Sequence, residues 1–276
     1  MVSLLIDCHE LEARIATDHP PVVLDVRWTL GGPSGEGDFR SGHIPGAQFV
    51  DLDRELSGTP GPGRHPLPDA ASFGAAMRRH GVDRSRPVVV YDAATSTSAA
   101  RAWWLLRYFG HSNVALLDGG YAAWTAAGLP VEEGVDSGPV AGDFVAIPGG
   151  MPLLDAEGAA TTARTGVLVD ARAPERFRGE IELVDPIAGH IPGARNLPAQ
   201  QTQHSDGTFF SPEALRDRYA VIGVAPGEQV AVYCGSGVVA TEGVFAMGLA
   251  GIDAALYAGS WSEWITDPAR PVEVGG

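Results

Sequence analysis

The sequence predicts an α/β protein with two domains of the same kind, each a mostly parallel sheet with helices on both faces. The first observation behind this prediction is an internal repeat, because the motif Gly-His-Ile-Pro-Gly-Ala occurs at residues 42–47 and again at 189–194. The second is that short apolar runs alternate with segments of helical periodicity, which is typical of parallel sheets with crossover helices. The third is a Gly- and Pro-rich stretch at 134–150, where a linker is expected.

Other motifs also return in the same order in the second half. The segment Leu-Asp-Val-Arg at 24–27 corresponds to Val-Asp-Ala-Arg at 169–172, and Val-Tyr-Asp at 90–92 corresponds to Val-Tyr-Cys at 232–234. Two copies of one domain are the simplest explanation of a repeat that keeps its order. Because the aspartate and arginine of the first motif occur in both copies, we interpret them as structural residues.

Each copy has the alternation expected of a parallel sheet. In the first copy, buried strands are expected at 22–26, 88–91 and 114–117, and helices at 72–80, 96–109 and 121–127. The 276 residues suit two domains of ordinary size, each able to bury its own core. We expect the first domain at 1–138, a linker at 139–150 and the second domain at 151–276. In sheets of this kind the reactive crevice lies beyond the carboxyl ends of the strands.

One cysteine stands where a strand is expected to turn into a helix. Cys234 follows the apolar run 230–233 and opens the sequence Cys-Gly-Ser-Gly-Val, after which apolar residues recur at helical spacing. The glycines allow backbone N–H groups to converge on one point, and the positive end of the helix dipole favours an anion there. Cys234 is therefore predicted to be a reactive thiolate at neutral pH. The same place in the first copy holds Asp92, followed by Ala-Ala-Thr-Ser, so only the second copy is expected to carry this chemistry.

The composition excludes several classes of function. The chain carries 19 basic and 34 acidic side chains, and its formal net charge of −15 opposes binding to nucleic acid or to an anionic membrane. It contains no lysine, which excludes both a pyridoxal phosphate Schiff base and a Walker-type phosphate loop. The eight histidines fall as isolated residues without the spacing of a zinc site, so neither a metal nor a cofactor is expected.

Cysteine usage and hydropathy indicate the compartment. Cys8 and Cys234 lie in different copies, and a disulfide between them would consume the nucleophile, so we expect a reducing, cytoplasmic setting. No apolar run reaches the roughly 18 residues that a membrane span needs. The first seven residues lack both a basic region and a long apolar core, so no secretory signal is expected.

Two other classes of cysteine enzyme do not fit the loop. A tyrosine-phosphatase-like site needs an arginine six residues after the cysteine, where this chain has Ala240. A thioredoxin-like site needs a second cysteine three residues after the first, where this chain has Gly237.

Together, the cysteine loop, the repeated motifs and their order resemble the rhodanese superfamily over nearly the whole chain. The form Cys-Gly-Ser-Gly-Val is more similar to 3-mercaptopyruvate sulfurtransferases than to thiosulfate sulfurtransferases. The resemblance implies that Cys234 attacks a small anionic sulfur donor, holds the sulfane sulfur as a persulfide, and passes it to a thiol or to cyanide. Thioredoxin or a small thiol is the acceptor expected. The resemblance also implies that the first domain is a degenerate, non-catalytic copy that supports and partly covers the site of the second.

The resemblance further implies roles for individual residues. Arg176 matches the position of a substrate-binding arginine in this family, and its planar fork suits a carboxylate or a sulfonate. Arg178 is a second candidate for the same role. Catalytic roles are expected for Cys234, Ser236 and His43, and substrate contacts for Arg176, Arg178 and the loop residues Gly235, Ser236, Gly237, Val238 and Val239.

The chain departs from the family pattern at two places. His43 matches the histidine that is proposed to act with the loop serine in mercaptopyruvate enzymes, but the matching aspartate position holds Ser34. Eukaryotic mercaptopyruvate enzymes also carry a second substrate arginine before the Gly-His-Ile-Pro-Gly motif, and residues 182–186 contain none. His65, in Gly-Arg-His-Pro-Leu-Pro, is a further histidine expected to face the cleft between the domains.

Three functions remain open on the sequence alone. The donor is expected to be 3-mercaptopyruvate, because the loop offers the hydroxyl of Ser236, which can relay a proton to an enolate. Thiosulfate enzymes usually offer basic side chains in this loop, whereas residues 235–239 contain none. Thiosulfate is therefore the second choice of donor. A non-catalytic binding module built on the same fold is the third hypothesis.

Overall fold

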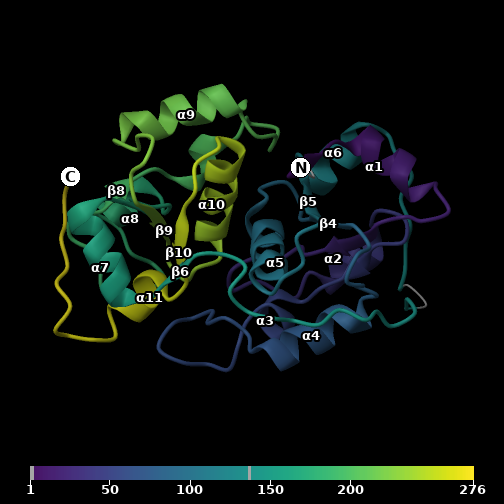
Figure 1. The fold of residues 1–276 in the computed structure, drawn as a ribbon, viewed down its shortest axis with the longest axis horizontal. Coiled ribbons are helices and arrows are strands. Elements are labelled where there is room, and N and C mark those ends of the chain that lie inside the picture. Colours follow the sequence, from purple (N-terminus) through teal and green to yellow (C-terminus); the bar gives the residue numbers. More distant parts are fainter. Residues whose placement is uncertain (1–2, 136–137) are drawn as a thin grey trace. The chain divides into compact units, whose positions relative to one another are not determined.

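The computed structural model describes residues 3–135 and 138–276, which fold as two compact units (Figure 1). The first unit comprises Met1–Gly58, Pro68–Met151 and Ser205–Thr208, and the second comprises Thr59–Leu67, Pro152–His204 and Phe209–Gly276. The sequence placed Thr59–Leu67 in the first domain, whereas in the structure this segment packs with the second unit. The unit that contains Cys234 is therefore completed by a short segment from the first half of the chain.

Five parallel strands form the sheet of the first unit. These strands are β1 (Leu5–Ile6), β2 (Val22–Asp25), β3 (Gln48–Phe49), β4 (Val88–Tyr91) and β5 (Val114–Leu117). The helices are α1 (Cys8–Ile15), α2 (Glu36–Ser41), α3 (Leu52–Glu55), α4 (Ala70–Arg79), α5 (Thr97–Tyr108) and α6 (Gly120–Ala126). The strands and helices expected from the apolar pattern all occur, with ends within two residues of the expected ones.

The second unit repeats this series of elements. Its strands are β6 (Leu153–Leu154), β7 (Val167–Asp170), β8 (Arg195–Asn196), β9 (Val230–Tyr233) and β10 (Ala255–Tyr257). Its helices are α7 (Ala156–Thr165), α8 (Pro174–Phe177), the 3₁₀ turn η1 (Ala199–Thr202), α9 (Pro212–Val221), α10 (Val239–Leu249) and α11 (Ser260–Trp264). The strand order is β1-β5-β4-β2-β3 in one sheet and β6-β10-β9-β7-β8 in the other, so the two sheets have the same topology. The predicted fold class, two α/β domains of one kind, is confirmed.

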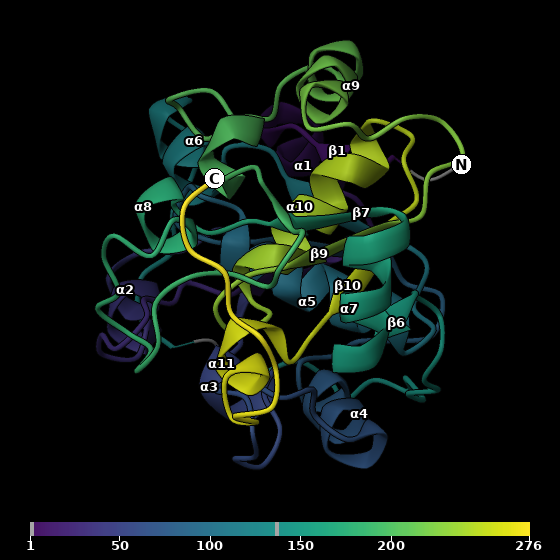
Figure 2. The same ribbon diagram turned by 90° about the vertical axis from the view of Figure 1, so that its left-hand side faces the viewer.

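Helices cover both faces of the sheet in the second unit. On one face, Phe177 of α8 and Trp261 and Trp264 of α11 pack with the strand side chains Leu168, Ala231, Tyr233 and Tyr257. On the other face, α10 approaches β9 so closely that a Cβ at Gly243 would lie 3.0 Å from Val232 Cγ1. Helix α9 lies against α10, and Tyr219 Oη donates to the carbonyl oxygen of Gly243. Figure 2 shows this layering, with α9, α10, β9 and α11 in order from top to bottom.

A buried ion pair explains why two separate motifs repeat in both units. Arg27 pairs with Asp25 at 2.7 Å, and the same Nη2 atom donates to the carbonyl oxygen of Gly42 at 2.7 Å. This arrangement ties the end of β2 to the Gly-His-Ile-Pro-Gly-Ala turn, where Gly46 takes a positive φ of 74° that favours glycine. The prediction that the repeated aspartate and arginine are structural agrees with these contacts.

We predict that Arg27→Met lowers the free energy of unfolding by about 3–5 kcal/mol, because it leaves the carboxylate of Asp25 buried without its cation. Urea denaturation followed by tryptophan fluorescence measures the change. The control is Arg54→Met, since Arg54 pairs with Asp51 at 3.8 Å and its side chain is 86% exposed, and such pairs contribute at most about 1 kcal/mol. Equal stability of the two variants would contradict a structural role for the buried pair.

Candidate active site

Cys234 lies directly after β9, at the carboxyl end of the sheet, as the sequence predicted. Its side chain is buried, with 1% of the residue exposed. The backbone N–H of Gly237 donates to Cys234 Sγ at 3.2 Å, and the N–H of Cys234 itself donates to Ser260 Oγ at 3.1 Å. The sulfur is therefore held at the start of α10 by a backbone donor of its own loop.

Glycines stand at two positions of this loop, and of the two only Gly237 has a backbone conformation that favours glycine. Gly237 has a φ of 77°, and a Cβ there would clash with the carbonyl oxygen of Ala258. Gly235 leaves room for two guanidinium groups, because a Cβ there would lie 2.7 Å from Arg64 Nη2 and 3.6 Å from Arg176 Nη1. Two arginines of the second unit therefore converge on the residue that follows the cysteine.

Ser236 is held by a histidine from the segment that completes this unit. Its Oγ and the Nδ1 of His65 share a hydrogen bond of 2.8 Å. Both residues are buried. The hydroxyl and the imidazole thus form a pair that can pass a proton, two residues along the chain from Cys234.

Arg176, near the end of α8, is fixed by two carboxylates. Its Nε and Nη2 donate to Glu182 at 3.0 and 2.8 Å, and Nη2 also donates to Asp185 Oδ2 at 3.0 Å. Glu182 lies 3.6 Å from Arg172 Nη1 as well, so Arg176 is connected to the buried Asp170–Arg172 pair of this unit. These contacts orient the guanidinium toward the loop at Gly235.

Asp185 bridges the two arginines near the loop. One of its oxygens pairs with Arg64 Nη1 and the other with Arg176 Nη2, and its side chain is only 3% exposed. Burial raises the pKa of Asp185, although Arg64 and Arg176 oppose this effect. Burial acts in the same direction on Glu182, but N–H groups of Asp185 and Val184 together with Arg176 outweigh it and lower the pKa of Glu182.

The family is decided by this cysteine loop on a duplicated sheet together with a match to a known family model. The model of the rhodanese-like domain matches residues 7–127 and 155–267, which covers both copies and most of the chain. The chain belongs to the rhodanese family.

Two relatives from bacteria match the rhodanese chain almost from end to end. SseB of Mycobacterium tuberculosis, which bears the name of a thiosulfate sulfurtransferase, is 46% identical over 99% of this chain and 97% of its own length. A Pseudomonas aeruginosa protein with the name of a 3-mercaptopyruvate sulfurtransferase is also 46% identical, over 98% of each chain. Among solved structures, the 3-mercaptopyruvate sulfotransferase SseA of Escherichia coli matches with a TM-score of 0.85 and 31% identity, over 94% of this chain and 99% of SseA.

In the first rhodanese domain the aspartate Asp92 takes the place of the cysteine. Asp92 follows β4 and accepts five hydrogen bonds of 2.9–3.3 Å from the loop and the first turn of α5. Four come from backbone N–H groups and one from the hydroxyl of Ser98. The side chain therefore satisfies the donors that would otherwise face a bound anion, which agrees with the interpretation of this copy as degenerate.

His43 does not differ from its counterpart in the other rhodanese domain. Its Nδ1 bonds to the carbonyl oxygen of Phe39 at 2.9 Å and its ring stacks on Phe39, while His190 makes the same two contacts with Phe177. A contact present in both copies is explained by the fold. The catalytic role expected for His43 stays a prediction, and the histidine that the structure joins to Ser236 is His65.

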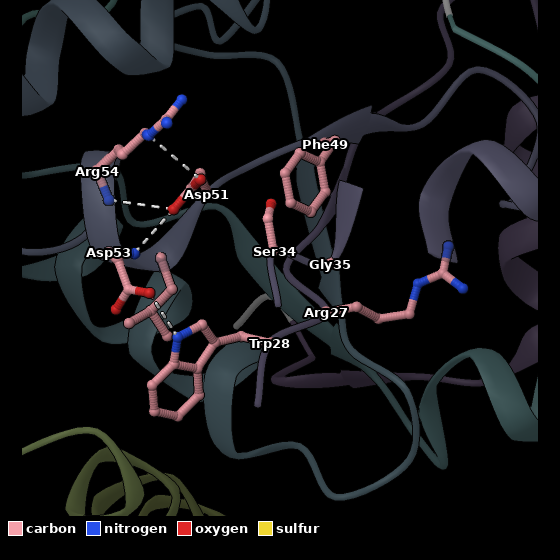
Figure 3. A pocket seen from close by; sticks show the side chains of 9 residues that line it. Arg27, Trp28, Ser34, Gly35, Phe49, Asp51, Asp53 and Arg54 are labelled. Carbon is pink, nitrogen blue, oxygen red and sulfur yellow. Dashed lines mark hydrogen bonds and ion pairs between the residues drawn. The ribbon is translucent and has the colours of Figure 1, made fainter. Parts of the chain in front are cut away.

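The remaining residues named in the sequence analysis lie in different parts of the structure. Arg178 forms an ion pair of 2.7 Å with Glu180, and both side chains are exposed. Ser34 lines a pocket of about 210 Å³ in the first unit, where Trp28 Nε1 donates to Asp53 at 3.0 Å (Figure 3). Val238 and Val239 form the junction of the loop with α10.

Two residues of this site were not assigned by the sequence. Arg64 belongs to the same short segment as His65, and the only signal for it was its place beside that histidine. Asp185 gave no signal, because an acidic residue next to a substrate arginine is indistinguishable in sequence from one at the surface. Their pairing depends on how the segment Thr59–Leu67 packs, which the sequence pattern did not predict.

Other features of the described residues do not add to this site. A cavity of about 560 Å³ is lined by residues 224–228 and 250–253, which precede β9 and β10 and so lie at the opposite edge of the sheet. Within the described ranges, no three His, Cys, Asp or Glu side chains are placed to hold a metal ion. No described helix has both the length and the apolar character to cross a membrane.

Proposed function

We propose that this protein is a sulfurtransferase that takes sulfane sulfur from 3-mercaptopyruvate and passes it, through a Cys234 persulfide, to a thiol or to cyanide. The observation that carries the proposal is the loop itself, in which a buried cysteine with an N–H donor on its sulfur lies next to two arginines and a serine–histidine pair. A thiolate, an anion site and a proton carrier are the three parts that this reaction needs.

The first step is nucleophilic attack by the Cys234 thiolate on the sulfur of the donor. The new S–S bond forms as the C–S bond of mercaptopyruvate breaks, and the electron pair of that bond leaves as the enolate of pyruvate. The carboxylate of the donor binds Arg176, whose planar fork suits this group. The backbone donors of the loop from Gly235 to Val239 stabilise the persulfide that remains.

The pair formed by Ser236 and His65 transfers the proton that this step moves. The enolate becomes pyruvate when its carbon takes up a proton, and the persulfide loses its own proton to become an anion. A hydroxyl bonded to an imidazole at 2.8 Å is suited to carry that proton between the two. This role takes the place of the one that the sequence gave to Ser236 with His43.

In the second step a thiolate attacks the outer sulfur of the persulfide, and Cys234 leaves as a thiolate. Thioredoxin or a small cytoplasmic thiol is the acceptor we propose. Cysteine usage supports a reducing compartment for such a cycle.

Thiosulfate is the alternative donor. The M. tuberculosis relative bears the name of an enzyme for this donor at the same identity as the relative named for mercaptopyruvate. Thiosulfate loses sulfite, a stable anion that needs no proton to leave. The serine–histidine pair therefore favours mercaptopyruvate, because only that donor gives a leaving group that must be protonated.

We predict that Cys234→Ser abolishes both turnover and the mass gain of one sulfur after incubation with donor, because a hydroxyl cannot hold sulfane sulfur. Cys8→Ala is the control, since Cys8 is packed in the core of the first unit, where burial raises the pKa of its thiol. Mass spectrometry and pyruvate release measure the result. Wild-type rates in the serine variant would exclude this mechanism, and no mass gain in the wild type would favour the binding module.

The expected effect of Arg176→Ala is a strong rise in KM for both anionic donors. Each charge-assisted hydrogen bond lost corresponds to about 1.5–3 kcal/mol, or roughly a tenfold to hundredfold loss in kcat/KM. Arg176→Lys should recover only part of it, because a point charge does not reproduce the fork. The matched control is Arg178→Ala, and an equal loss there would return Arg178 to the donor site.

Ser236→Ala and His65→Gln should each slow the reaction with mercaptopyruvate more than the reaction with thiosulfate, by about tenfold or more in the ratio of kcat/KM values. The reason is that these variants remove the proton carrier, which only the enolate requires. Steady-state kinetics with both donors in parallel measure the ratio. If both donors lost the same factor, the pair would serve to position the loop rather than to transfer a proton.

A further inference from the structure

The donor site contains more fixed charge than one arginine and one substrate carboxylate require. Arg64 and Arg176 converge on Gly235, while the carboxylate of Asp185 lies between their guanidinium groups and pairs with each through a different oxygen. Glu182 separately occupies the Nε–Nη2 edge of Arg176. Asp185 thus makes the contacts that the carboxylate of a donor would make.

Arg64 is placed as a binding residue rather than as a surface charge. Its backbone N–H donates to Ser262 Oγ at 3.1 Å, which anchors the segment on α11. Its Nε is buried, and within the described part of the chain this atom has no hydrogen-bond partner. A buried guanidinium N–H without an acceptor is costly, so an acceptor on a bound molecule would stabilise it.

We propose that Arg64 is the second arginine of the donor site and that Asp185 is an internal carboxylate which occupies this site until the carboxylate of the donor displaces it. The inference rests on the proposed function for the identity of the donor. The second arginine then comes from the segment Thr59–Leu67. The family resemblance led us to look for it at residues 182–186, but that segment contributes the competing acid, Asp185.

Displacement of Asp185 explains how two arginines can bind a donor although two acidic side chains, Asp185 and Glu182, lie beside them. While Asp185 is in place, both guanidinium groups are neutralised without any ligand. When a donor carboxylate replaces it, the arginines keep an anionic partner, and Asp185 turns toward solvent. The exchange asks only the side chain of Asp185 to rotate, because the N–H of Asp185 stays bonded to Glu182 and the neighbouring Leu183 is 91% exposed and so adds no packing that would oppose the rotation.

Alkylation of Cys234 tests this inference without any sulfur donor. Iodoacetate and iodoacetamide both transfer a carbon to the thiolate with loss of iodide, but only iodoacetate carries a carboxylate for the arginines. The ratio of their second-order rate constants at Cys234, measured by peptide mass spectrometry, therefore reports the affinity of the site for a carboxylate.

We predict that Asp185→Asn raises the ratio of iodoacetate to iodoacetamide rates by about fivefold or more, and that Arg64→Ala lowers it by a similar factor. Arg64→Lys should give an intermediate ratio and serves if the alanine variant does not fold. The matched control is Glu180→Gln, which removes one negative charge from an exposed carboxylate in the same segment and should leave the ratio unchanged.

Three outcomes would overturn the inference. An unchanged or lower ratio in Asp185→Asn would make Asp185 a structural part of the site, and an unchanged ratio in Arg64→Ala would remove Arg64 from it. An equal rise of the ratio in Glu180→Gln would mean that any loss of negative charge in this segment has the same effect, whether or not the carboxylate contacts the arginines. Because no donor is needed, these outcomes stay separate from those that test the proposed function, which depend on whether Cys234 takes up sulfur from mercaptopyruvate. Where it does, KM for mercaptopyruvate should fall in Asp185→Asn while kcat changes little.

Discussion

The active loop depends on a buried ion pair at the end of the strand beside it. Arg172 forms an ion pair of 2.7 Å with Asp170 and donates to the carbonyl oxygen of Gly189. These contacts fix the turn at residues 189–194. The first unit has the same pair, but in the second unit the guanidinium also approaches Glu182, and Glu182 in turn holds Arg176. Since Asp170, Arg172 and Glu182 have side chains that are at most 4% exposed, the loss of any one of them would leave a buried charge without its partner. A contact that stabilises the fold thus also sets the direction of the arginine at the loop.

The two units have the same strand order but differ in the residue that follows one equivalent strand. Asp92 brings its own negative charge to the start of α5 and satisfies five donors there, so this place is filled by the chain itself. Cys234 brings an atom that accepts fewer hydrogen bonds and can be extended by a second sulfur. The glycines around it remove side chains, which leaves the adjacent space to Arg64 and Arg176. The difference between the copies lies in what occupies this space, since the strands and their order are the same.

The sequence predicted the features that depend on local pattern. The repeat, the parallel sheets and the place of Cys234 at a strand end followed from apolar periodicity and glycine spacing, and the structure has all three. The partner of Ser236 could not be predicted in this way, because His65 reaches it across 171 residues of sequence. His43 was expected to act with Ser236 because it matches a histidine of mercaptopyruvate enzymes, and its contacts with Phe39 are the same as those of His190 with Phe177, so these contacts alone do not distinguish the two copies. Sequence alone showed which residues are repeated but not which unit a loop joins.

An internal carboxylate in the donor site has a consequence for selectivity. A side chain attached to the site has a high effective concentration, so every external anion must compete with it. Small anions that offer weak or single contacts lose this competition, whereas a donor that also places its sulfur against the thiolate gains binding energy that Asp185 cannot provide. Asp185 therefore excludes weakly binding anions because it already occupies the arginines, and no steric barrier is needed. Selectivity then depends on the competition from Asp185 as much as on the attraction between the arginines and the donor. Asp185 also gives Arg64 an anionic partner when no donor is bound, whereas Arg176 keeps Glu182 as a partner in either case.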